Sequence, residues 1–288
     1  MQFTNKFGLP QSFVEAVTND PYGHDSDISI TKLINPPQMA ALQNKHDAEI
    51  IQDVSERVFS LLGQSVHTLL ERTITTDTIV EERFSLPVNG WEVSGQIDLY
   101  EKASDHLIDY KVTSAWSVLS SEPPKKEWVS QLNAYAHLLR AAGHTPRSLS
   151  ILAIVRDWSY AQQRRSDNYP PRSVVERPIP LLPPNQVQSW IEERVQLHQK
   201  ARAGTWDECT DEERWAKPDT WAVYAGRAKR ATRIFDSSED ALTHAQYLSN
   251  TEQRTHTVKH RRGSSPRCER YCSVAPFCPQ WDAIKKSS

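Results

Sequence analysis

Apolar residues recur in the first half of the chain with two different spacings, and each spacing predicts a type of element. Between Met39 and about Arg72 they recur at steps of three and four residues, which gathers them into one stripe along a helix. The members of this stripe are Ile51, Val54, Val58, Leu62, Val66 and Leu69. Residues 78–86, 91–101 and 106–113 have the composition of strands, and they predict three consecutive strands.

The two elements that follow complete an α/β pattern. Residues from Trp128 to Leu139 have helical periodicity and stop before Gly143, a residue type that commonly ends helices. Residues 148–155 form a mostly apolar run with the length of a buried strand. The order helix, three-stranded meander, helix, strand predicts an α/β core over residues 38–156.

Proline punctuation separates this core from the rest of the chain. Residues 1–37 show neither periodicity, and they predict an irregular N-terminal segment with a turn at residues 19–23. Residues 157–288 are polar and proline-rich, and they predict an appendage with helices near 185–201 and 237–248. We expect the appendage to pack rather than hang free, because it holds three large side chains that favour burial: Trp206, Trp215 and Trp221.

Composition narrows the class of protein. Only 38% of the residues are hydrophobic, but nine Trp, nine Tyr and seven Phe supply enough apolar surface to exclude wholesale disorder. The sequence holds no run of about 18 apolar residues, which excludes a transmembrane span. The first residues lack the apolar region of a secretory signal, and four cysteines do not make a disulfide scaffold. We therefore expect a cytoplasmic protein without a membrane partner.

The most informative stretch is the predicted hairpin that contains Asp98, Asp109 and Lys111. Asp109 and Lys111 share one strand face because they are two residues apart, and a tip at residues 103–104 places Asp98 opposite Asp109. Two adjacent carboxylates repel each other, and a divalent cation such as Mg²⁺ relieves that repulsion with oxygen ligands and bound water. Such a cation activates water while a lysine stabilises negative charge, so the hairpin holds what phosphodiester hydrolysis needs.

A simpler interpretation of the same three residues is an ordinary salt-bridge cluster on the surface. The flanking residues argue against it, because a charge among interior strands is costly and is usually paired or functional. These apolar neighbours are Ile97, Leu99, Leu107, Ile108 and Val112.

Three motifs in this order resemble those of a known family. They are G-x-I-D followed by I-D-Y-K-V-T in the hairpin, G-x-x-x-H at residues 63–67, and Q-x-x-x-Y at residues 131–135. Together they resemble the PD-(D/E)XK nucleases, specifically the RecB-like branch with CRISPR-adaptation exonucleases and viral recombination exonucleases. The resemblance covers about residues 50–156. It implies a restriction-endonuclease-like α/β core, in which helices flank a mixed central sheet.

The resemblance also implies roles for individual residues. His67, Asp98 and Asp109 would hold Mg²⁺ or Mn²⁺, with the backbone carbonyl of Tyr110 as a further oxygen ligand, and Lys111 would be the catalytic lysine. The remaining pair, Gln131 and Tyr135, would support the site or contact the DNA backbone.

The residues alone leave alternatives for these supporting positions. His67 beside an apolar stripe also fits a hydrogen-bonded core histidine. Gln131 and Tyr135 share a helix face, because they are four residues apart, and they also fit the edge of a solvent-exposed helix. Glu82 is a weaker candidate, for which a solvent-facing strand position is favoured.

The four cysteines are unevenly distributed. Clustered cysteines in a cytosolic enzyme favour a metal site over disulfides, and four thiolates suit either Zn²⁺ or an iron–sulfur cluster. The cysteines are Cys209, Cys268, Cys272 and Cys278. Some RecB-like nucleases bind a 4Fe-4S cluster through one distant and three C-terminal cysteines, often with a following proline, and Pro279 matches this arrangement.

This chain departs from that pattern in two ways. Three residues rather than two separate Cys268 from Cys272, and the distant Cys209 follows the predicted core instead of preceding it. We expect a C-terminal cysteine-ligated metal module with a 4Fe-4S cluster. The alternatives are Zn²⁺ and four reduced cysteines without a metal.

Positive charge gathers in the appendage, although the whole chain has a net charge of −2. Residues 227–233 contain four Lys or Arg and no acid, and residues 251–288 contain eight Lys or Arg against three acids. Such clusters bind phosphates, and nearby Trp and Tyr can stack on bases. A solvated basic face is the alternative interpretation.

The combined prediction is a metal-dependent DNA exonuclease that acts at DNA ends. The resemblance implies the production of single-stranded tails for recombination or repair, and a phage or prophage origin. The sequence lacks the G-x-x-x-x-G-K-S/T motif of motor ATPases, so any helicase would be a separate protein, as would a recombinase or annealing protein. Two alternatives remain: a catalytically idle, nucleic-acid-binding recombination partner with the same fold, and a zinc-stapled interaction module.

Overall fold

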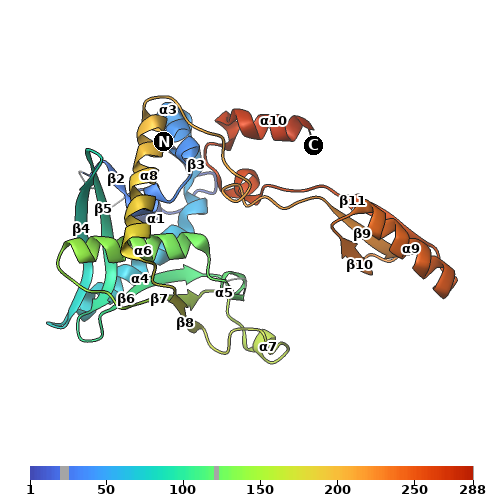
Figure 1. The fold of residues 1–288 in the computed structure, drawn as a ribbon, viewed down its shortest axis with the longest axis horizontal. Coiled ribbons are helices and arrows are strands. Elements are labelled where there is room, and N and C mark those ends of the chain that lie inside the picture. Colours follow the sequence, from blue (N-terminus) through green and yellow to red (C-terminus); the bar gives the residue numbers. More distant parts are fainter. Residues whose placement is uncertain (20–25, 120–122, 288) are drawn as a thin grey trace. The chain divides into compact units, whose positions relative to one another are not determined.

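The computed structural model describes residues 1–19, 26–119 and 123–287 (Figure 1). Most of the turn predicted at residues 19–23 therefore lies outside the described residues. The chain folds as two units, Met1–Trp206 and Asp207–Ser288.

A mixed six-stranded sheet forms the centre of the first unit. Its order is β2-β5-β6-β7-β8, and β4 pairs with β5. The pairs β4–β5, β5–β6 and β7–β8 are antiparallel, whereas β2–β5 and β6–β7 are parallel. The strands are β2 (Ile28–Ser29), β4 (Thr78–Val88), β5 (Trp91–Glu101), β6 (His106–Thr113), β7 (Ser148–Val155) and β8 (Val174–Ile179). The four strands predicted in the core are thus confirmed, as is the mixed sheet.

Helices α6 (Lys126–Ala141) and α8 (Pro184–Arg202) supply the other half of this core (Figure 1). The apolar side of α6 buries Leu132, Leu138 and Leu139 in the same cluster as Ile97 of β5 and Ile151 of β7. Helix α8 packs against α6 and against α3 (Pro37–His46). This arrangement fixes α6 against the sheet, which matters because α6 carries two of the predicted site residues.

The long helix predicted from Met39 to Arg72 is wrong in extent. The segment holds α3, a short strand β3 (Ile51–Asp53) and α4 (Val58–Leu70), joined by single helical turns. The break centres on Asp53, whose carboxylate accepts hydrogen bonds from Ser55 N at 3.1 Å and from Lys6 N at 2.9 Å. Strand β3 pairs in parallel with β1 (Gln2–Thr4), so a distant segment stabilises the interruption.

Two expected boundaries also differ from the structure. The segment 1–37 contains helix α1 (Gln11–Thr18) and helix α2 (Ile30–Leu33), and its strand β2 joins the central sheet. The first unit continues past residue 156 to Trp206. It does so because β8 completes the sheet beside β7 and because α8 buries an apolar stripe of Val187, Ile191 and Val195 in the core.

The second unit contains a smaller antiparallel sheet. Its strand order is β10-β9-β11, formed by β10 (Arg233–Phe235), β9 (Thr220–Ala225) and β11 (His256–Arg261). Helix α9 (Ser238–Glu252) packs on it around Val223, Ala241 and Ala245, and the chain ends in α10 (Pro279–Ser287). The helices predicted near 185–201 and 237–248 are confirmed as α8 and α9. Trp215, expected to be buried, remains 40% exposed.

Throughout the part of the chain that the structure describes, helices fall short of the length or apolar character that crossing a bilayer demands.

Candidate active site

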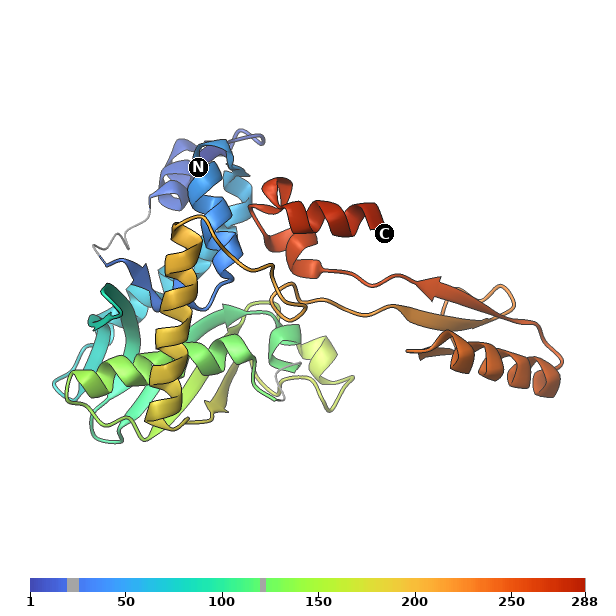
Figure 2. The ribbon, with the colours of Figure 1, turned by 45° about the horizontal axis from the view of Figure 1, so that its top comes forward.

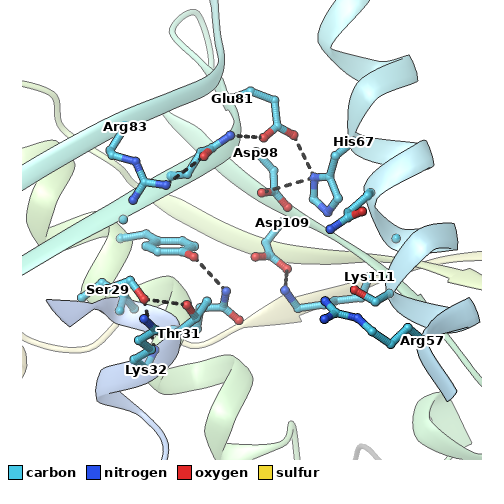
Figure 3. Close-up of a pocket in the computed structure, with 18 residues that line it drawn as sticks. Ser29, Thr31, Lys32, Arg57, His67, Glu81, Arg83, Asp98, Asp109 and Lys111 are labelled. Carbon is cyan, nitrogen blue, oxygen red and sulfur yellow. Dashed lines mark hydrogen bonds and ion pairs between the residues drawn. The ribbon is translucent and has the colours of Figure 1, made fainter. Parts of the chain in front are cut away.

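A cavity of 460 Å³ opens where α4, α6 and the strands β4, β5 and β6 meet (Figure 3). Its walls carry every side chain that the sequence analysis assigned to the nuclease centre. These lining residues are His67, Asp98, Asp109, Lys111, Gln131 and Tyr135. The predicted residues therefore converge on one space, although they come from four different elements.

The hairpin register follows the sequence prediction. Leu99 pairs with Ile108 and Tyr100 with Leu107, so the same register places Asp98 opposite Asp109. The backbone pairing ends at Leu99, and the amide of Tyr110 donates instead to Asp98 Oδ2 at 2.7 Å. This bond fixes the buried Asp98 carboxylate beside Asp109 at the point where the two strands separate.

Asp109 and Lys111 form the second half of the centre. Lys111 Nζ lies 2.6 Å from Asp109 Oδ2, and the Asp109 residue is only 1% exposed. Within the described residues, Asp109 Oδ1 has no hydrogen-bond partner, and Oδ2 has only this contact with Lys111. A buried carboxylate normally accepts several hydrogen bonds, so the two Asp109 oxygens have unused capacity for a ligand that is not part of the chain.

His67 comes to this centre from α4. Its Nδ1 lies 2.8 Å from Glu81 Oε1 and 3.6 Å from Asp98 Oδ1. The imidazole thus bridges two carboxylates from neighbouring strands, as Figure 3 shows. The core-histidine alternative does not describe this environment, because the side chain faces acidic groups in an open cavity.

Glu81 is the residue that sequence reasoning missed. The pairs Val80–Leu99 and Glu82–Ile97 flank it, which places it opposite Asp98, and its φ of 51° lies in the left-handed region. The neighbouring Glu82, the weaker candidate, is exposed. The sequence did hold a signal for Glu81, namely the Asn-Gly pair at residues 89–90, which is typical of a two-residue hairpin turn. Both residues have positive φ in the structure, as this turn requires, and the turn fixes the register of β4 against β5.

Neighbouring side chains hold Glu81 in place. Gln96 Nε2 donates to Glu81 Oε2 at 2.7 Å, and Arg83 donates to Gln96 Oε1 at 3.1 Å. One Glu81 oxygen therefore faces His67 while the other is tied to this amide, which limits the orientations available to the carboxylate.

Gln131 and Tyr135 lie deep in the cavity wall and not at a solvent-exposed helix edge. Both are buried, and Gln131 Nε2 donates to the Tyr135 hydroxyl at 2.9 Å. The Tyr135 ring packs directly on the β5 backbone, because a Cβ at Gly95 would stand only 2.6 Å from its Cε1. Gly95 in the G-x-I-D motif is thus explained by this close approach.

In the absence of a cation, the surroundings of Asp98 and His67 raise the pKa values of both groups and favour their protonated forms. Burial, followed by the charge of Asp109, raises the pKa of Asp98 from 3.8 to about 7. The hydrogen bond to Glu81 raises the pKa of His67. Burial alone would lower the pKa of Lys111, but the charges of Asp109 and Asp98 outweigh it and raise that pKa. Lys111 therefore carries its positive charge at neutral pH.

The donor set fits a divalent cation. Ligand atoms of His67, Glu81 and Asp98 lie within 4.8 Å of one another. Two carboxylates and one imidazole suit Mg²⁺ or Mn²⁺, and the buried Asp109 Oδ1, which has no hydrogen-bond partner among the described residues, lies in the same cavity. Asp109 is not a member of the group formed by His67, Glu81 and Asp98. Ligation of the metal by the backbone carbonyl of Tyr110 stays a prediction.

The cysteines form a different arrangement in the second unit. All four are free thiols, and Gln280 links Cys209 to the C-terminal helix through bonds of 3.0 and 2.8 Å to its backbone. Burial, followed by Glu213 and the other three cysteines, raises the pKa of Cys209 to about 12. Among the described residues, the group of side chains close enough to hold a metal ion is His67, Glu81 and Asp98, and no cysteine belongs to it. The expected metal module is therefore not preformed as a single-ion site.

The match to a family model agrees with this geometry. The model of the PD-(D/E)XK nuclease superfamily matches residues 32–279, which is most of the chain. A solved structure titled "Crystal structure of SSO0001" is 15% identical, with a TM-score of 0.45, over 64% of this chain and 84% of that one. No protein with a curated description matches the sequence.

Proposed function

Because the chain belongs to the PD-(D/E)XK nuclease superfamily, we propose that it is a Mg²⁺- or Mn²⁺-dependent deoxyribonuclease that works as an exonuclease at DNA ends. The observation that carries the proposal is the buried Asp109 carboxylate. Among the described residues its Oδ1 has no hydrogen-bond partner and its Oδ2 contacts Lys111 alone, and both oxygens lie beside the group of His67, Glu81 and Asp98.

Each residue has a distinct part in the proposed hydrolysis. His67, Asp98, Glu81 and Asp109 would hold the cation, and the Tyr110 carbonyl would add a further oxygen. When bound, the cation supplies charge neutralisation and an acidified water at the scissile phosphate. Lys111, which is held charged by its acidic neighbours, donates to phosphate oxygens where negative charge develops.

Gln131 and Tyr135 would orient the substrate. Burial raises the pKa of Tyr135, so its hydroxyl keeps its proton and can donate to a phosphate oxygen while accepting from Gln131. The Tyr135 ring packs against Gly95, and this contact limits the directions that the hydrogen bond can take.

The decisive experiment compares end-labelled linear DNA with closed circular DNA, with Mg²⁺, Mn²⁺ or EDTA. We expect metal-dependent degradation of linear DNA, no cutting of the circle, and loss of activity in Asp109→Ala. Asp77→Ala is the matched control, because Asp77 is exposed in a loop. Equal activity in the wild type and Asp109→Ala would refute the site assignment, and cutting of the circle would refute the exonuclease. DNA binding without cleavage would favour the idle binding protein.

We also propose that the four cysteines bind a 4Fe-4S cluster and not zinc. The support is the electrostatic influence of Cys268, Cys272 and Cys278 on Cys209, which brings the four thiols into one neighbourhood. Its role would be structural. Iron and zinc analysis of anaerobically purified protein tests this, since stoichiometric zinc without iron would contradict it.

The proposed cellular context is recombination or repair, in which the nuclease produces single-stranded tails. The partners would be a recombinase or annealing protein and a separate helicase. Strand degradation on substrates opened by a helicase, compared with intact duplex, tests the need for that partner.

A further inference from the structure

The small sheet of the second unit is covered on one face only. Side chains alternate between the two faces of a strand, and Trp221, Val223 and Val258 point to the side where α9 packs. Figures 1 and 2 both show α9 running along this side of β9 and β11. Among the described elements, α9 is the one that packs extensively on this sheet. The opposite side is called here the open sheet face, and no helix in the described part of this unit packs extensively on it.

The register identifies the residues of the open sheet face. Arg261 lies opposite Thr220, Lys259 and Ile234 lie on either side of Ala222, and Thr257 lies opposite Tyr224. The full set is Thr220, Ala222, Tyr224, Ile234, Thr257, Lys259 and Arg261. The charged residues of this face are Lys259 and Arg261, and the set contains no Asp or Glu.

Tyr224 is the centre of a cation–aromatic group. Lys259 Nζ lies 5.2 Å and Arg261 Cζ 5.8 Å from the centroid of the Tyr224 ring, and Arg261 donates to the Tyr224 hydroxyl at 2.7 Å. Beside them, Ile234 is 50% exposed. The face thus combines positive charge with an aromatic ring and an uncovered apolar side chain.

The loop that follows β9 extends the positive charge. Arg227, Lys229 and Arg230 are all exposed, and no acid interrupts residues 226–235. The ion pairs recorded in the described part of this unit join carboxylates to Arg214, His256, His260 and Lys285. The loop cations and the two cations of the open sheet face are thus left to attract an external anion.

The sheet is held firmly at its base. Lys217 and Ser264 exchange backbone hydrogen bonds of 2.9 and 3.1 Å, and Asp219 accepts from Gly263 N at 2.7 Å. The same Asp219 carboxylate contacts His260 Nε2 at 2.6 Å. These bonds join the segment that enters the sheet to the segment that leaves it. The open sheet face is therefore part of a hydrogen-bonded sheet and not of a loose loop.

We propose that the open sheet face binds single-stranded DNA, as a second contact surface beyond the catalytic cavity. The inference rests on the proposed function for its substrate class. Lys259, Arg261 and the loop cations match the phosphate backbone. Tyr224 and Ile234 match exposed bases, which a single strand offers and a duplex hides in its stack. DNA is therefore held at a surface that carries none of the catalytic groups.

The test measures binding of a fluorescein-labelled oligonucleotide by anisotropy, in EDTA and in the full-length Asp109→Asn background to prevent cleavage. We expect Lys259→Glu/Arg261→Glu to weaken single-strand binding at least about tenfold. The slope of log affinity against log salt should fall by about 1.4, at roughly 0.7 per lost phosphate contact. Lys259→Gln/Arg261→Gln should give an intermediate loss. The charge-matched control, Lys45→Glu/Lys200→Glu on exposed positions of α3 and α8, should bind like its parent.

The outcomes separate this inference from the proposed function. Equal affinity of the reversal variant and the control would overturn the inference, whether or not the wild type cleaves DNA. A loss confined to duplex binding would overturn the single-strand assignment. If the wild type cleaves no DNA but the reversal variant alone loses single-strand affinity, the proposed function fails and the open sheet face stands. Circular dichroism spectra that match the parent are required for each variant before its affinity is compared.

Discussion

Asp98→Asn should stabilise the metal-free protein while it abolishes nuclease activity. Asp98 is buried beside Asp109, and its pKa is raised from 3.8 to about 7. Each pKa unit corresponds to about 1.4 kcal/mol, so the ionised Asp98 costs the fold up to about 4 kcal/mol. Asparagine carries no charge, and its carbonyl can still accept the hydrogen bond from Tyr110 N that Asp98 accepts at 2.7 Å.

The sign of the pH dependence follows from the direction of this shift. Below the unfolded pKa of about 4 the carboxyl is neutral in both states and costs nothing. As pH rises from there to about 7, the unfolded chain ionises freely while the folded state resists, and stability is lost. The advantage of Asp98→Asn should thus be small near pH 4, grow as the pH rises towards 7, and be close to its full value at pH 8.

The assay is urea unfolding in EDTA at pH 4, 5, 6.5 and 8, followed by circular dichroism. Asp105→Asn is the matched control with the opposite sign, because hydrogen bonds from Tyr100 and Thr145 lower the pKa of Asp105 and its charge stabilises the fold. An Asp98→Asn protein that is no more stable than the wild type at pH 8 would refute the reasoning. So would an advantage that does not change with pH.

Three further outcomes test the site. Mg²⁺ or Mn²⁺ should raise the melting temperature more at pH 8 than at pH 5.5, because protons on the raised-pKa groups compete with the cation; a pH-independent shift in differential scanning fluorimetry would contradict this. Glu81→Gln should weaken metal affinity by about 10- to 100-fold in calorimetry, whereas the exposed neighbour Glu82→Gln should not change it. Gly95→Ala should cost about 1–3 kcal/mol of stability and lower kcat, since its Cβ would meet Tyr135 at 2.6 Å. Gly63→Ala, with nothing within 4 Å of the added carbon, should not destabilise the fold, and a loss equal to that of Gly95→Ala would contradict the packing argument.

Local sequence signals predicted the hairpin because both of its determinants are local. Alternation fixed the faces of β5 and β6, and the short turn fixed their register, so the Asp98–Asp109 juxtaposition follows from neighbouring residues. The same kind of signal at Asn89–Gly90 fixes the partner of Glu81. What periodicity could not predict was the left-handed backbone at Glu81, because a glutamate seldom adopts it without tertiary support.

The long predicted helix failed for a non-local reason. Its apolar spacing runs through Ile51, yet Ile51 is 63% exposed and sits in a strand. The interruption depends on Asp53 bonding to Thr4 and Lys6, nearly fifty positions away, and no pattern within the segment records those partners. The extent of the core was missed as well, because β8 contains a glutamate, an arginine and a proline and resembles the polar, proline-rich loops around it.

The paired base of the small sheet also has an architectural meaning. The segment from Pro218 to Arg262 begins and ends at the same place, because Lys217 and Ser264 on either side of it are paired through their backbones. Because the flanking residues are already adjacent, a tight turn could replace this segment without a change in the path of the chain before Lys217 or after Ser264. Cys209 and the three later cysteines all lie outside this stretch, so its replacement would leave every cysteine in the chain.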